Sequence, residues 1–148
     1  MNINFLVPNL KNSQLGLYLL QECNKARGVS PIIFVEGAST FTARPQVPVM
    51  NVAEAWHQEG PFVATTPSLT QKMLTFPRAT KRIFYVWDLY WIRGNKRMYE
   101  PYLYLFSQPE LHIVARSESH RDLIEQSFNV EVDAIVENFG LAGFIKML

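Results

Sequence analysis

The first 35 residues contain two short hydrophobic runs separated by one amphipathic segment, and this spacing constrains the fold more than any other feature. Residues 3–7 and 31–35 have the length of strands, and Pro8 ends the first of these runs. Between them, residues 14–27 repeat hydrophobic side chains at helical spacing, with Ser13 placed to cap the helix and Gly28 to end it. A strand, a helix and a strand in so short a segment predict a βαβ unit with parallel strands and a right-handed crossover.

The same alternation continues along the rest of the chain. Residues 83–87, Ile-Phe-Tyr-Val-Trp, form the most hydrophobic run, which is typical of a strand buried on both faces. We expect further strands at 47–50, 62–65, 111–114 and 130–136, and helices at 52–57, 67–76, 96–106, 117–128 and 140–148. With 148 residues, the sequence predicts one α/β domain over residues 1–148, a single Rossmann-like three-layer domain with a mostly parallel sheet.

Several function classes lack support in the sequence. The single cysteine, Cys23, excludes an internal disulfide and a multi-thiolate metal site, and His57, His112 and His120 do not have metal-ligand spacing, so we expect no metal. Glycine-rich phosphate loops are absent, which leaves no cofactor to expect. No hydrophobic run approaches the roughly 20 residues that span a bilayer, and the N-terminus does not resemble a signal peptide, so we expect a cytoplasmic protein without a membrane partner.

The loops after the strands hold the candidate functional residues, because ligands of open α/β sheets bind at the carboxyl ends of the strands. Asp88 follows the most buried run directly. At a strand end its carboxylate could accept a proton from a substrate hydroxyl or hold a sugar, whereas the alternative is that it caps a following turn. His120, in the first turn of an expected helix, could face the same edge, while His112 lies inside an expected strand and is interpreted as structural.

A basic and aromatic segment follows Asp88. Arg93, Lys96 and Arg97 lie between Trp91 and Tyr99. Such a mixture could bind phosphates and stack on bases or sugars, so a nucleic-acid partner is one interpretation. The alternative is a solvent-exposed loop that leads into a helix. The charge is uneven as well, with seven bases and two acids over residues 61–108, but three bases and seven acids over residues 109–148.

Three segments resemble the amino-terminal half of two-domain (GT-B type) glycosyltransferases. Residues 83–88 are similar to the strand that in many such enzymes ends in a His-Asp pair. Residues 114–121 are similar to the strand that leads through Ser-Glu into a helix, and residues 128–138 to the last strand before the second domain. The resemblance covers most of the order of elements. Its departures are Trp87 in place of the histidine, a first loop without the usual glycines, and Phe139 between Asn138 and Gly140.

In such enzymes the amino-terminal half binds the acceptor and the other half binds the nucleotide sugar. The resemblance therefore implies a glycosyltransferase-like acceptor-binding domain that acts with a donor-binding partner chain or persists as a binding remnant. It implies Asp88 as the catalytic residue, and it implies the acceptor-binding residues Asn9, Ser13, Arg93, Arg116, Ser117, Glu118 and Asn138.

Two other functions stay open. One is a non-enzymatic interaction module that uses residues 78–99 to contact a protein or a nucleic acid. The other is a small nucleotide-binding enzyme of flavodoxin-like shape, which the absence of a phosphate loop disfavours. A homo-oligomer is compatible with each of these functions.

Overall fold

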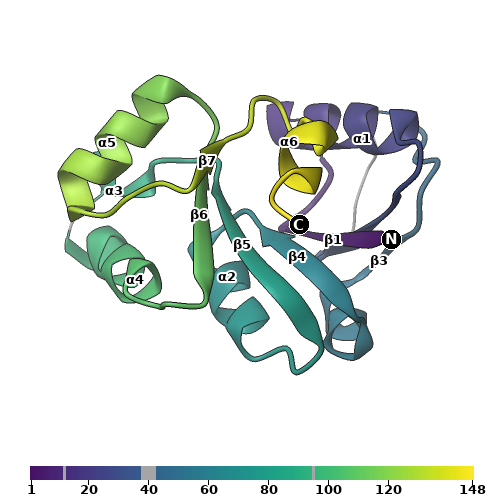
Figure 1. The fold of residues 1–148 in the computed structure, drawn as a ribbon, viewed down its shortest axis with the longest axis horizontal. Helices are drawn as coiled ribbons and strands as arrows, with labels where there is room; N and C mark the ends of the chain where they lie inside the picture. The colour runs from purple at the N-terminus through teal and green to yellow at the C-terminus, as the bar shows by residue number, and fades with distance from the viewer. Residues whose placement is uncertain (12, 38–42, 95) are drawn as a thin grey trace.

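The computed structural model describes residues 1–11, 13–37, 43–94 and 96–148, and these residues form one seven-stranded sheet with helices on both faces (Figure 1). The strands are β1 (Asn2–Val7), β2 (Ser30–Val35), β3 (Val49–Asn51), β4 (Gly60–Ala64), β5 (Ala79–Val86), β6 (Leu111–Ala115) and β7 (Ala134–Ile135). The helices are α1 (Gln14–Lys25), the 3₁₀-helix η1 (Val52–His57), α2 (Pro67–Leu74), α3 (Tyr90–Arg93), α4 (Lys96–Phe106), α5 (Glu118–Phe128) and α6 (Leu141–Ile145).

The strand order is β3-β2-β1-β4-β5-β6-β7, and every neighbouring pair is parallel. From β1 the chain builds outward to β3, returns to the other side of β1 and then builds outward to β7. This is the Rossmann order with one more strand at the far edge, and its topological switch point lies between β1 and β4. The predicted α/β, Rossmann-like fold is confirmed, and the sheet is parallel throughout.

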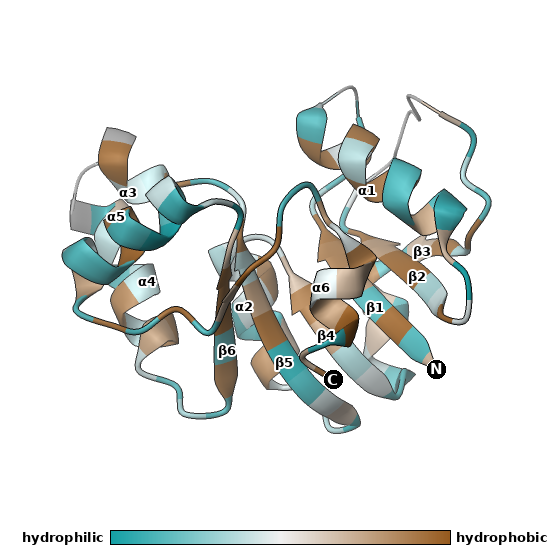
Figure 2. Ribbon diagram, turned by 45° about the horizontal axis from the view of Figure 1, so that its top comes forward, coloured by the Kyte–Doolittle hydropathy of each residue, from teal (hydrophilic) through white to brown (hydrophobic). Residues whose placement is uncertain are grey.

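Two hydrophobic layers cover the sheet, because alternate side chains of each strand point to opposite faces. On one face, Phe5 of β1 and Tyr85 of β5 pack with α1 and α6. On the other face, Phe62 of β4 and Phe84 of β5 pack with η1, α2, α4 and α5. Figure 2 shows β6 as a largely hydrophobic strand and α5 as a mostly hydrophilic helix, as expected for a sheet buried under solvent-facing helices.

Side-chain caps fix where several helices begin. The Ser13 hydroxyl accepts a hydrogen bond from the Gly16 amide at 3.2 Å, which confirms the predicted cap of α1. Thr66 caps α2 through the Leu69 amide at 3.2 Å, with Pro67 in the first helical turn. These caps satisfy amides that have no partner inside their helix, so the entry of each helix from its strand is well defined.

Some elements differ from the expectation. Residues 52–57 form a 3₁₀-helix, α3 was not predicted, and the last strand is only β7 instead of residues 130–136. In that stretch side chains take some of the backbone partners: the Val132 amide donates to the Glu125 carboxylate at 3.1 Å, and the Ile113 amide donates to the Asp133 carboxylate at 2.7 Å. The Asp133 amide still donates to the Ile113 carbonyl at 2.8 Å, and the Val136 amide to the Ala115 carbonyl at 2.9 Å. Regular pairing is therefore limited to β7.

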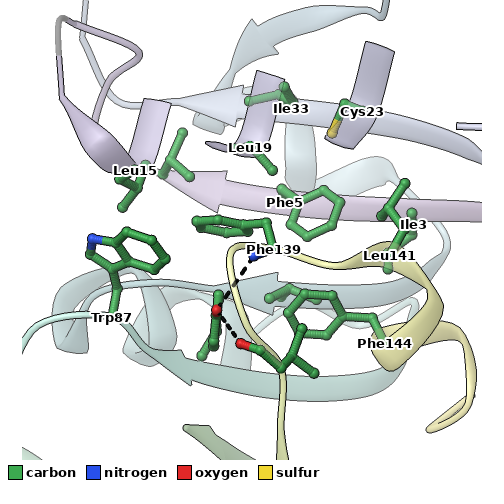
Figure 3. Close-up of a cluster of buried hydrophobic side chains, with 14 of the residues drawn as sticks. Ile3, Phe5, Leu15, Leu19, Cys23, Ile33, Trp87, Phe139, Leu141 and Phe144 are labelled. Atoms are coloured by element: carbon green, nitrogen blue, oxygen red, sulfur yellow. Dashed lines mark hydrogen bonds between the residues drawn. The ribbon is translucent and has the colours of Figure 1, made fainter. Parts of the chain in front are cut away.

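The turn before α6 places an aromatic side chain in the core. Phe139 has a positive φ of 60°, and so does Asn138 at 47°. Such backbone conformations are costly for residues other than glycine and persist where the surroundings compensate for them. Phe139 is fully buried, and its ring stacks on Trp87 with the centroids 5.0 Å apart (Figure 3). Its amide donates to the Tyr85 hydroxyl at 3.5 Å, and that hydroxyl donates to the Val136 carbonyl.

The departure at Phe139 from the Asn-Gly pattern thus has a structural role. Phe139 ties the segment after β7 to the centre of the sheet, together with Phe144 of α6, whose ring lies 5.2 Å from that of Tyr85 (Figure 3). Burial raises the pKa of Tyr85 to about 12, so its hydroxyl stays protonated and keeps both hydrogen bonds at neutral pH. The aromatic cluster therefore holds β5, which carries Trp87 and Asp88 at its end.

Candidate functional site

A cavity of about 430 Å³ lies where β5 and β6 end, at the carboxyl edge of the sheet. Its volume falls within the range of small-molecule sites. Residues from two connections meet there: the segment after β5 with α3, and the segment that leads from the end of β6 into the first turn of α5. The lining residues are Trp87, Asp88, Leu89, Tyr90, Ile92, Arg116 and His120. We name this space the Asp88 cavity.

Asp88 is exposed, and its carboxylate accepts a hydrogen bond from the Tyr90 hydroxyl at 3.0 Å. It does not cap the following helix, because the residue at the N-cap of α3 is Leu89 and no side chain caps that helix. Burial, followed by the nearby Asp88 charge, raises the pKa of Tyr90 to about 12, which keeps the Tyr90 hydroxyl a donor at neutral pH. Asp88 therefore offers a carboxylate to the cavity instead of to a turn.

Arg116 and Trp87 form a second unit of the cavity. The Arg116 guanidinium lies 3.9 Å from the centre of the Trp87 ring and donates a hydrogen bond to the Trp87 carbonyl at 3.4 Å. Because the indole is itself held by Phe139, the guanidinium has a rigid platform. The cavity thus combines a carboxylate acceptor, a fixed cationic donor and aromatic surface.

His120 enters the cavity from the first turn of α5, where the Ser117 hydroxyl accepts a hydrogen bond from the His120 amide at 3.2 Å. Burial and then the positive charge of Arg116 lower the pKa of His120, although Asp88 and a hydrogen bond to the Val86 carbonyl oppose this shift. The imidazole is therefore neutral at pH 7. Among the described residues, its Nδ1 is buried without a hydrogen-bond partner. A neutral imidazole can donate one hydrogen bond and accept another.

The histidine pKa gives a direct check of this electrostatic environment. In an NMR titration the His120 ring should charge with an apparent pKa below its ordinary value of 6.5, since burial and Arg116 both disfavour the imidazolium. Replacing Arg116 by methionine should raise that pKa, because one of the two opposing causes is removed. An apparent pKa above 6.5, or one that Arg116→Met leaves unchanged, would show that the two side chains do not share the cavity.

None of the other predicted site residues whose side chains the structure describes lines this cavity. Asn9 accepts a hydrogen bond from the Lys11 amide at 3.0 Å, and Ser13 caps α1. Ser117 caps α5, Glu118 is exposed in the first turn of that helix, and Asn138 is exposed in the strained turn before α6. The side chain of Arg93 lies outside the described residues. Of the eight predicted residues, the structure brings Asp88 and Arg116 together in the cavity.

Five lining residues were not among the predicted site residues, and three of them carry aromatic or hydrogen-bonding side chains: Trp87, Tyr90 and His120. The sequence indicates Trp87 as the end of a buried strand, in the place of the histidine of the glycosyltransferase pattern, and His120 as a histidine that could face the edge; it gives no role to Tyr90. The sequence pattern could have indicated these three residues, because each lies within two residues of a strand end or inside the first turn of a following helix. What the pattern could not supply was the rotation of α5, which decides whether position 120 faces the sheet edge.

Residues 78–99 do not gather on one surface. Arg78 pairs with Glu59 at 2.9 Å near the amino end of β5, whereas Arg97 is exposed on α4 beyond the opposite end of that strand. The eight residues of β5 separate the two groups by roughly 25 Å at 3.3 Å per residue. The side chain of Lys96 lies outside the described residues. The interaction-module alternative over residues 78–99 stays a prediction.

Within the described residues, no group of three or more histidine, cysteine, aspartate or glutamate side chains is arranged to hold a metal ion. Over the same residues, no helix combines the length and hydrophobicity needed to cross a bilayer. Comparison with protein-family models, with curated proteins and with solved structures finds no match for this chain.

Proposed function

We propose that this chain is a glycosyltransferase-like acceptor-binding domain and that it binds its acceptor in the Asp88 cavity. The observation that carries the proposal is the set of side chains at the ends of β5 and β6, where Asp88, Arg116 and His120 line one space beside the Trp87 ring. The resemblance of residues 83–88 and 114–121 to the acceptor half of GT-B type glycosyltransferases adds to it, since those segments supply this edge.

The chemistry of the cavity suits a polyhydroxylated ligand. A carboxylate accepts hydrogen bonds from hydroxyl groups, and a guanidinium donates several in a fixed geometry. Tyr90, which is 37% exposed, adds aromatic surface against which the less polar face of a sugar ring can pack. Since the carboxylate and the guanidinium carry opposite charges, the ligand needs no net charge of its own.

In a transfer reaction Asp88 would act as the general base. It would accept the proton of the acceptor hydroxyl while that oxygen attacks the anomeric carbon and the nucleoside diphosphate leaves. The glycosyltransferase resemblance assigns the donor to a second domain, so we propose that a donor-binding partner chain supplies the nucleotide sugar. The histidine of the usual His-Asp pair has a counterpart in space, because His120 of α5 lines the cavity with Asp88.

The three tryptophans make a direct test. A library of mono- and disaccharides, added to ¹⁵N-labelled protein, should contain members that shift the indole signal of Trp87, which lines the cavity. The indole of Trp56, which is exposed on η1 outside the cavity, serves as the internal control and should not move. A library that leaves Trp87 unchanged at millimolar concentrations, or that shifts Trp56 instead, would reject the proposed function.

A further inference from the structure

A second cavity, of about 340 Å³, lies beside the first between the start of α2 and the side of α4. It is near the switch point of the sheet, because α2 follows β4. The residues that define its character are Thr66, Pro67, Tyr90, Met98, Pro101 and Tyr102. We name it the Met98 cavity.

The Met98 cavity offers few hydrogen-bonding groups to an occupant. Thr66 uses its hydroxyl to cap α2, and its carbonyl accepts from the Thr70 hydroxyl at 2.7 Å. Pro67 has no amide hydrogen, so the start of α2 lacks one of the donors with which helix N-termini hold anions. The Tyr102 hydroxyl already donates to the Asp88 carbonyl at 3.3 Å. The polar groups left on the lining are those of Ser68 and Gln71 at the start of α2, and the rest is the Tyr102 and Tyr90 rings, Pro101 and Met98.

Tyr90 belongs to the walls of both cavities. Its hydroxyl holds the Asp88 carboxylate in the first cavity, while Tyr102 of the second cavity holds the Asp88 carbonyl. The two spaces are therefore adjoining parts of one surface at the carboxyl edge, the first polar and charged, the second hydrophobic. A ligand bound at Asp88 that carries a substituent directed toward α4 reaches the second space past one tyrosine ring.

We infer that the acceptor is an amphipathic glycoside, with its sugar in the Asp88 cavity and an aromatic or alkyl substituent in the Met98 cavity. This inference rests on the proposed function, because it assigns the second cavity to the same ligand. A space of about 150 Å³ can hold benzene, so the Met98 cavity has room for a phenyl ring. Met98 is a flexible side chain, which adapts to hydrophobic groups of different shape.

The test compares matched glycosides. Methyl and phenyl glycosides of the same sugars, glucose, galactose and mannose, are titrated into protein labelled at the methionine methyl groups. For a sugar that binds, the phenyl glycoside should bind about tenfold more tightly than the methyl glycoside, because the ring is removed from water. The Met98 methyl signal should shift with the phenyl glycoside and not with the methyl glycoside.

Two variants on α4 make the comparison specific. Met98→Glu should reduce the phenyl-to-methyl affinity ratio to about one, because it places a charge in the cavity. Leu103→Glu is the matched control, since Leu103 is also an exposed hydrophobic residue of α4, at 44% against 40% for Met98, and lines neither cavity. It should leave the ratio at about ten.

The outcomes separate this inference from the proposed function. Equal affinities for methyl and phenyl glycosides in the unchanged protein would overturn the inference and leave the sugar site in place. If neither glycoside binds but benzyl alcohol shifts the Met98 signal, the proposed function is wrong. The inference that one acceptor occupies both cavities is then wrong as well. If Met98→Glu instead changes the oligomeric state in sedimentation, this face is an interface between copies, which also overturns the inference.

Discussion

Replacing Asp88 by asparagine should weaken sugar binding by on the order of 10- to 100-fold. The variant keeps the size of the side chain and removes its charge, and hydrogen bonds to charged groups contribute about 1.5–3 kcal/mol. The fold should not change, because Asp88 is exposed and makes no cap. The measurement is the dissociation constant of the best-binding sugar, followed through the Trp87 indole signal, with the unfolding midpoint as the check on folding.

Two controls show whether the carboxylate itself is responsible. Asp122→Asn makes the same chemical change at an exposed aspartate of α5 that pairs with Arg121 outside the cavity, and it should leave the dissociation constant unchanged. Tyr90→Phe removes the hydroxyl that occupies the Asp88 carboxylate and leaves the charge in place, so it should not mimic Asp88→Asn. If Asp88→Asn binds as well as Asp122→Asn does, Asp88 is not part of the acceptor site.

Replacing Phe139 by alanine should lower the free energy of unfolding by about 3–5 kcal/mol, the usual cost of truncating a buried phenylalanine. The ring is fully buried and packs on Phe5, Tyr85 and Trp87. Its loss also leaves the positive φ of this residue without the packing that compensates for it. Denaturant unfolding measures the change. Under native conditions the variant should also bind sugar more weakly, because Trp87 loses the ring that supports it.

Phe144→Ala is the matched control for this second effect. Phe144 is also fully buried and its ring contacts Phe5 and Tyr85, and no ring contact with Trp87 is found among the described residues. The two variants should therefore lose similar stability, while sugar affinity should fall only in Phe139→Ala. Equal affinities for the two variants would show that Phe139 supports the core without supporting the site.

The sequence predicted those elements whose hydrophobic pattern is local and regular. The βαβ unit of β1, α1 and β2 follows from a strand period, a helix period and a serine cap within 35 residues. For β5, the sequence predicted only the hydrophobic half. The strand begins four residues earlier, at Ala79, and includes Arg82, whose side chain donates a hydrogen bond to the Phe76 carbonyl at 2.8 Å. The length of β7 was overestimated because the side chains of Glu125 and Asp133 take some of the backbone partners before it. The strand order depends on contacts between distant segments, which no local pattern contains.

The candidate site was predictable in its position and only partly in its members. Asp88 and Arg116 could be found because each lies within two residues of the end of a buried strand, and parallel strands end at the same edge. Whether His120 lines the cavity depends on how α5 is rotated over β6. The position of Tyr90 depends on α3, a four-residue helix without a capping side chain among the described residues. Asn9 and Ser13 follow a strand end as well, but the segment after β1 uses them for its own turn and cap.

The site also lies away from the switch point between β1 and β4, the usual ligand position in this fold class. The side chains after β1 explain part of this. Asn9 and Ser13 are engaged by nearby backbone amides, and Leu10 is fully buried. The polar groups that converge on an open space are instead those after β5 and β6, and the Met98 cavity extends that surface back toward β4.

The most direct test of the account is a crystal structure of the protein with the best-binding sugar of the library. We predict the sugar in the Asp88 cavity, with one hydroxyl donating to the Asp88 carboxylate in place of Tyr90 and a second oxygen within hydrogen-bonding distance of Arg116 or His120. A sugar bound at the ends of β1 and β4, or anywhere that leaves the Asp88–Tyr90 hydrogen bond intact, would contradict the account.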